Sequence, residues 1–140
     1  MRKNLQSYRQ VDVNSSVLTA DPHVIISMLY TGIFDALAIA KGGIERKDLE
    51  LKAKSLSKAI NILQSLQYSL DFDSRPEISN NLNDFYQICI NKLTQASTNL
   101  SISEIDETIE LMMPLADAWR NIPESDKQEG LDLLSKKQAS

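Results

Sequence analysis

The sequence predicts an all-α protein built on four amphipathic helices. Only four glycines and four prolines interrupt its 140 residues, and runs of β-branched residues are few. After residue 22, apolar side chains recur every three or four positions, which is the spacing of one face of an α-helix. A chain of this length can bury one hydrophobic core. We therefore expect an N-terminal tail at 1–20, a four-helix domain at 21–123 and a C-terminal extension at 124–140.

The tail is polar but carries apolar anchors, among them Leu5 and Tyr8. These two residues are three positions apart, so they fit on one turn of a helix. Such a tail is suited to docking on an apolar surface.

The first helix begins at Asp21 and Pro22. The aspartate can accept hydrogen bonds from the free amides of the first turn, and proline lacks a donor that would have no partner there. Gly42 and Gly43 resemble a helix stop, but the apolar stripe resumes after them. We expect the helix to continue to about Arg46.

The next three helices carry their own start signals and apolar stripes. The second runs over about 48–70. The third opens with SRPE, where Ser74 and Glu77 fit a capping box, and the fourth opens with SISE, where Ser101 and Glu104 fit another. The expected core stripes are Leu49, Ala53, Leu56, Ile60, Leu63, Leu66 and Leu70 in the second helix, Ile78, Leu82, Phe85, Cys89, Leu93, Ala96 and Leu100 in the third, and Ile105, Ile109, Met112, Met113, Ala116 and Trp119 in the fourth.

Two features near the C-terminus modify this pattern. Pro114 falls inside the fourth helix, where it removes a backbone hydrogen bond and should bend the axis; we favour a tolerated bend over a functional hinge. The ending SDKQEGLDLLSKKQAS has the pattern of a short fifth helix around Leu131, Leu133 and Leu134.

Composition excludes several classes of protein. The net charge is −4, and the 15 basic and 19 acidic residues are scattered along the chain. The sequence therefore has no basic stripe of the kind that binds nucleic acid, and we do not expect nucleic acid as a partner. The longest apolar region, Val24–Ala40, is shorter than the roughly 20 residues that span a bilayer, and the N-terminus has no apolar block typical of a signal peptide. One cysteine excludes an internal disulfide framework. We expect a soluble intracellular protein without membrane insertion.

The sequence also lacks the patterns of an enzyme or cofactor site. No phosphate loop, dinucleotide-binding glycine motif or haem motif is present. His23, the only histidine, has no Cys, Asp or Glu beside it at the spacing of metal ligands. We therefore expect it to be a residue of the first helical turn that faces water, and not a catalytic base or a metal ligand. We expect Cys89 to be a small buried apolar residue, and we expect Asp71 and Asp73 to lie in a solvated turn. We expect no catalytic residue, metal or cofactor.

The first helix is more apolar than one core requires. Placed at 100° per residue, its apolar side chains cover an arc of about 200°, which runs from Met28 and Ile39 to Ile26 and Tyr30. Phe34 extends this arc, whereas packing on one core needs about 100° or somewhat more. Tyr68, Tyr86 and Ile90 also lie off the core stripes. Taken singly, each is an ordinary exposed apolar residue. Together with the anchored tail, they favour a groove that binds an apolar helix or an extended peptide.

Four blocks of the sequence resemble the signatures of a known family. They are SYRQVDVNSSVLTADPHVIISMLYTG, LSKAINILQSLQYSLD, ISNNLNDFYQICINKL and LADAWRNI, in this order over about 8–122. They resemble the bacterial flagellar secretion chaperones, the FliS family.

The resemblance implies a compact antiparallel four-helix bundle in the bacterial cytoplasm. It implies that the protein binds the disordered C-terminal segment of flagellin and so prevents premature polymerisation. It also implies that the protein presents flagellin to the flagellar type III export gate. Other flagellar proteins are further candidate partners. The family's N-terminal segment can occupy part of the client groove. Our hypothesis is that Leu5 and Tyr8 form a lid over a groove that includes Ile26, Tyr30 and Phe34.

A helical-bundle adaptor or regulator that binds a folded protein partner is the competing interpretation. A chaperone should bind an isolated unfolded peptide and make it more helical, whereas an adaptor should need a folded surface.

Overall fold

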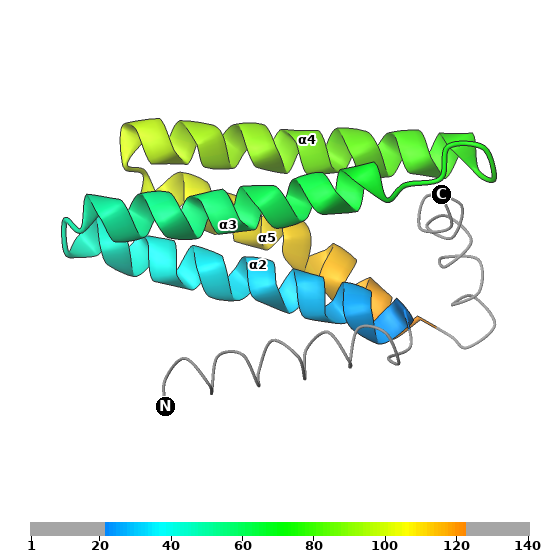
Figure 1. Cartoon of the computed structure of the whole chain (residues 1–140), viewed down its shortest axis with the longest axis horizontal. Coiled ribbons are helices and arrows are strands. Elements are labelled where there is room, and N and C mark those ends of the chain that lie inside the picture. The colour runs from blue at the N-terminus through cyan, green and yellow to red at the C-terminus, as the bar shows by residue number, and fades with distance from the viewer. Residues whose placement is uncertain (1–21, 123–140) are drawn as a thin grey trace, which may run out of the picture.

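The computed structural model describes residues 22–122, and all regular secondary structure in that range is helical. Its elements are α2 (Pro22–Glu45), α3 (Leu49–Tyr68), α4 (Pro76–Asn99) and α5 (Ile102–Arg120). Each helix packs on the one before and the one after it, and α5 also packs on α2, so the four surround one core (Figure 1). The short connections make successive helices antiparallel. The predicted all-α helical bundle is confirmed.

Two other predictions concern residues outside the described range. They are the tail at 1–20 and the short helix around Leu131, and the division of the chain into three parts therefore stays a prediction.

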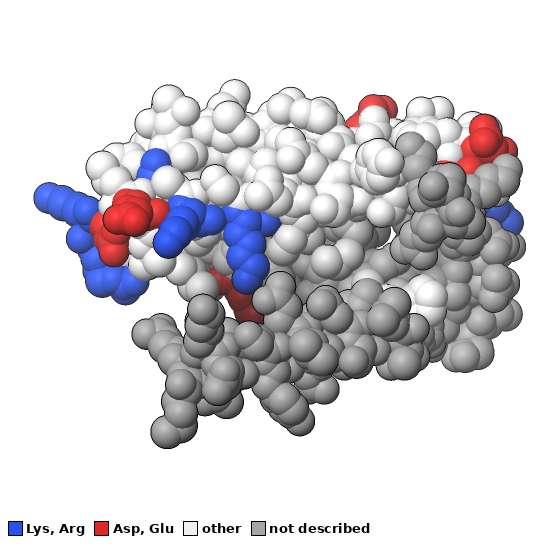
Figure 2. Space-filling model, viewed as in Figure 1, with Lys and Arg blue, Asp and Glu red and all other residues white. Residues whose placement is uncertain are grey.

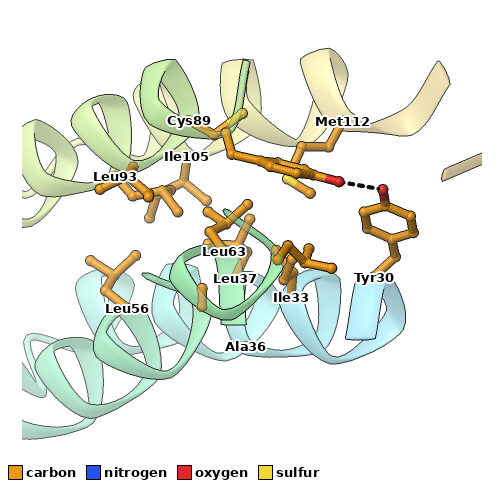
Figure 3. Packing of buried hydrophobic residues seen from close by; sticks show 14 of the residues in the cluster. Tyr30, Ile33, Ala36, Leu37, Leu56, Leu63, Cys89, Leu93, Ile105 and Met112 are labelled. Carbon is orange, nitrogen blue, oxygen red and sulfur yellow. Dashed lines mark hydrogen bonds between the residues drawn. The ribbon is translucent and has the colours of Figure 1, made fainter. Parts of the chain in front are cut away.

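The core consists of side chains from all four helices (Figure 3). The largest apolar side chains with almost no exposed surface are Ile33, Leu37, Leu56, Leu63, Leu93, Ile105 and Met112. Fully burying one such side chain stabilises the fold by about 1.5–3 kcal/mol, so this set is the main source of stability.

By length and composition, α2 is the one described helix that could cross a membrane. Ile33, Leu37 and Ala40 of this helix are nevertheless completely buried within the bundle. Because the core helix of a soluble protein passes the same test, we interpret α2 as such a helix.

The α2–α3 junction explains the two adjacent glycines. As predicted, α2 continues through Gly42 and Gly43 and ends at Glu45. A Cβ atom at Gly43 would lie 2.9 Å from the backbone nitrogen of Lys52, so this glycine lets α3 approach α2 closely. The turn itself is made by Lys47, which adopts a φ of 60°.

The buried face of α3 differs from the prediction at its start. Asp48 caps the helix by accepting a hydrogen bond from the amide of Leu51 (3.1 Å). Leu49 and Ala53 are exposed, however, and Ser55 and Ala59 are buried in their place. The reason is the contact with α2: Lys52 lies against Gly43, and residues three and seven positions further along share its face.

The connection between α3 and α4 is built around Asp71. We expected Asp71 and Asp73 to be solvated, but Asp71 is only 3% exposed. Its carboxylate accepts from the amide of Asp73 (2.9 Å) and the hydroxyl of Ser74 (2.7 Å). Because Ser74 is engaged there, the capping box with Glu77 is wrong, and α4 begins at Pro76 without a side-chain cap.

The buried face of α4 is also rotated from the expected stripe. Tyr86 and Ile90, expected off the stripe, are buried, whereas Ile78 and Leu100 at its two ends are exposed. The rotation follows from the arrangement of the bundle, because α4 has to cover α3 and α5 at once. Tyr68 of α3 is 73% exposed, as expected.

The start of α5 agrees with the sequence. The hydroxyl of Ser101 accepts from the amide of Glu104 (3.1 Å). The helix continues through Pro114, which lies on its exposed side. Met113 was placed in the core but is 47% exposed. Of the other predicted core residues, Ile105, Met112 and Ala116 are buried, and Ile109 and Trp119 are partly buried.

Candidate functional site

The one cysteine of the chain packs inside the bundle. Cys89 is completely buried, as predicted, and burial raises the pKa of its thiol to about 11 despite the nearby Lys92, which lowers it. At neutral pH the group is therefore a protonated thiol, a poor nucleophile. Between residues 22 and 122, no three His, Cys, Asp or Glu side chains are grouped so that they could hold a metal ion.

His23 joins the start of α2 to the end of α5. It is only 8% exposed, so the expectation that it faces water is wrong. Its Nε2 atom lies 2.6 Å from the backbone oxygen of Trp119, and the indole of Trp119 donates to the backbone oxygen of His23 (3.0 Å). The two rings are stacked, with centroids 5.0 Å apart. This reciprocal contact closes one end of the bundle.

A pair of tyrosines crosses the core between α2 and α4. The hydroxyl oxygens of Tyr30 and Tyr86 are 2.8 Å apart and buried, and Figure 3 shows this contact beside Met112. Burial raises the pKa of Tyr30, and it raises that of Tyr86 well above the usual value. Each hydroxyl therefore remains protonated and supplies the partner that the other needs.

The residues predicted to line a groove lie at different depths. Ile26 and Tyr30 are 7% and 4% exposed and face the core, and Phe34 is partly buried against it. Leu5 and Tyr8 lie outside the described residues. The assignment of these five residues to a groove and its lid stays a prediction.

The structure places other apolar side chains of α2 at the surface. Val24, Met28 and Ile39 are 45%, 46% and 49% exposed. At spacings of four and eleven positions they share one face of the helix, opposite the core. Sequence reasoning included Met28 and Ile39 in the wide apolar arc of this helix but could not tell which part of the arc remained open.

This outer face of α2 is hollowed. One depression is lined by α2 and, from α5, by Arg120; its α2 residues are Val24, Ser27, Met28, Thr31, Gly32 and Asp35. Its lining includes two apolar side chains, Val24 and Met28, one acidic and one basic side chain. We call it the α2 outer groove.

A second depression follows the neighbouring surface of α3. Its apolar residues are Leu29, Ala53 and Ile62, and Lys54 and Lys58 stand beside them. Figure 2 shows that basic side chains, with acidic ones among them, gather towards the end where α2 and α3 meet, while much of the remaining face in that view is uncharged. The two depressions together form an extended, mostly apolar surface on the α2 side of the bundle.

Comparison with known proteins identifies the family. The family model described as flagellar protein FliS matches residues 4–126. The flagellar secretion chaperone FliS of Salmonella typhimurium is 38% identical over 127 residues, covering 89% of this chain and 94% of that protein. The FliS protein of Vibrio cholerae is 32% identical over 123 residues, covering 88% and 90%. This chain belongs to the FliS family.

The match confirms the resemblance seen in the four sequence blocks. It extends over the four helices and over much of the N-terminal tail, so Leu5 and Tyr8 are FliS positions as well. FliS is a family of flagellar secretion chaperones, and a chaperone acts through a binding surface. The open apolar face of α2 is therefore the candidate functional site.

Proposed function

We propose that this protein binds the disordered C-terminal segment of flagellin in the bacterial cytoplasm. Binding would keep flagellin from polymerising early and would support its export through the flagellar type III secretion system. The observation that carries the proposal is the row of exposed apolar residues Val24, Met28 and Ile39 on the outer face of α2. Exposed apolar side chains that gather on one face of a helix are typical of a surface that another chain covers.

The physical requirements of such a client fit this surface. A disordered segment loses conformational entropy when it docks, so it must bury a long apolar area to bind. The α2 outer groove and the neighbouring groove along α3 supply that area on adjacent helices. Neither groove is deep, which suits a segment that lies along the bundle.

Calorimetric titration of the full chain with a synthetic peptide from the flagellin C-terminus of the same organism tests the proposal. We expect saturable binding with a negative heat-capacity change, because apolar surface is buried. Circular dichroism should show a gain of helix in the peptide. If a correctly folded protein does not bind the peptide even after removal of residues 1–20, the proposal is wrong and the adaptor interpretation stands.

We also propose that the tail shields the groove when no client is bound. Leu5 and Tyr8 would form the lid over a groove that includes Ile26, Tyr30 and Phe34. The double change Leu5→Ala and Tyr8→Ala should then strengthen peptide binding several-fold and increase the fluorescence of the dye ANS, because the tail no longer competes. Unchanged affinity and unchanged ANS fluorescence would show that there is no lid.

A further inference from the structure

A second apolar surface lies between α4 and α5. Three large apolar side chains are exposed there: Ile78 and Ile88 of α4 are 41% and 51% exposed, and Leu111 of α5 is 41% exposed. Phe85 and Leu115, which pack against the core, are only partly buried. We call these five residues the α4–α5 seam.

The register of the two helices places these residues side by side. Lys92 of α4 and Glu107 of α5 form an ion pair at 3.0 Å. The helices are antiparallel, so one turn before Lys92 on α4 lies beside one turn after Glu107 on α5. Ile88 of α4 is therefore next to Leu111 of α5. The next turn brings Phe85 next to Leu115. The seam is therefore a continuous apolar stripe and not a set of scattered residues.

Acidic side chains border this stripe. Glu107, Glu110 and Leu111 line one hollow together with Lys92. Asp84, one turn before Ile88, is exposed on the other helix. Among the described residues that line this hollow, Lys92 is the one basic side chain, and it is paired with Glu107. Asp84 and Glu110 therefore make the described border of the seam negative.

The seam is distant from the surface proposed for the client. The helices surround the core in the order α2, α3, α4, α5, so the α4–α5 edge is opposite the α2–α3 edge (Figure 1). A partner bound at the seam leaves the α2 outer groove open.

The geometry points to a docking surface for an amphipathic helix of a partner protein, with an apolar stripe flanked by Lys or Arg. An exposed apolar stripe along the junction of two helices is a surface on which the apolar face of such a helix can pack. The acidic border selects a basic partner through complementary charge. A second copy of this chain is disfavoured because a two-fold contact would bring the same carboxylates together.

Two synthetic 18-residue helical peptides test this inference on the full chain. Both carry leucines at helical spacing; one has lysines beside the leucine stripe, and the other has glutamates at the same positions. Chemical shifts of the ¹⁵N-labelled protein report the binding site, and fluorescence anisotropy reports the affinity. We expect the lysine peptide to shift residues 78–92 and 107–118 and to bind at least tenfold more tightly than the glutamate peptide.

Variants at exposed positions, checked for unchanged folding by circular dichroism, locate the contact. Ile88→Ser with Leu111→Ser should weaken the lysine peptide at least tenfold, whereas the matched control Val24→Ser with Met28→Ser should leave it within twofold. Asp84→Lys with Glu110→Lys should reverse the preference between the peptides. Equal binding of both peptides, chemical-shift changes confined to other helices, or no binding at millimolar peptide would overturn the inference. It would also be overturned if the protein were a dimer that the seam substitutions convert to a monomer.

Discussion

At the scale of single residues, the tyrosine pair holds α2 and α4 at a fixed separation. Tyr30 and Tyr86 satisfy each other's hydroxyl groups inside an otherwise apolar core. A buried polar group without a partner costs more than an ordinary hydrogen bond contributes, so each hydroxyl depends on the other.

Removing one hydroxyl should therefore destabilise the protein more than removing both. We expect Tyr86→Phe to lower the free energy of unfolding by about 1–3 kcal/mol, because Tyr30 is left unpaired. The double change Tyr30→Phe and Tyr86→Phe should recover part of the loss. Urea unfolding measures both. A double variant less stable than either single one would contradict this account.

Cys89 should make stability depend on pH in the alkaline range. Burial raises its pKa from 9.0 to about 11, so the unfolded thiol ionises first. The free energy of unfolding therefore keeps the contribution of the neutral Cys89 thiol below pH 9 and loses it as pH rises towards 11. The expected loss between pH 8 and 10 is about 1 kcal/mol. Urea unfolding at these two values should show this loss, and Cys89→Ala should show a smaller one. An equal loss in both proteins would exclude the thiol as the cause.

At the scale of the helices, local sequence signals predicted where the helices begin and end better than they predicted which face of each helix is buried. The caps at Asp48 and Ser101 and the continuation through Gly43 follow from the sequence nearby. Which face becomes buried depends on the neighbouring helix. For this reason Ser55 replaced Leu49 in the core and Tyr86 was misplaced, although the hydrophobic spacing was identified correctly.

The two glycines of α2 provide a matched test of helix packing. Gly43→Ala should destabilise the protein by about 1–3 kcal/mol, because the new Cβ would meet the backbone of Lys52 at 2.9 Å. Gly42→Ala should be neutral or stabilising by up to about 1 kcal/mol, since it meets only the flexible end of Arg46 and improves helix propensity. Thermal or urea unfolding of the two variants gives the comparison. Equal effects at both positions would mean that the close approach of α3 to α2 is unimportant.

At the scale of the whole molecule, the excess apolar surface of α2 was predictable, but the position of the open part was not. Ile26 and Tyr30 belong to the predicted arc and yet face the core, whereas Val24 and Met28 face outward. An arc about 200° wide leaves its orientation undetermined until α3 and α5 are placed against it. His23 was misplaced for the same reason, because its partner Trp119 comes from the far end of the domain.

The central claim is that the client binds on the outer face of α2. The most direct measurement compares the affinity of the flagellin C-terminal peptide for Val24→Ser with Met28→Ser and for Ile88→Ser with Leu111→Ser. All four positions are exposed, so both proteins should fold as the parent does. We predict at least a tenfold loss of affinity for the α2 variant and a change within twofold for the seam variant. Equal affinities, or a loss confined to the seam variant, would contradict the claim.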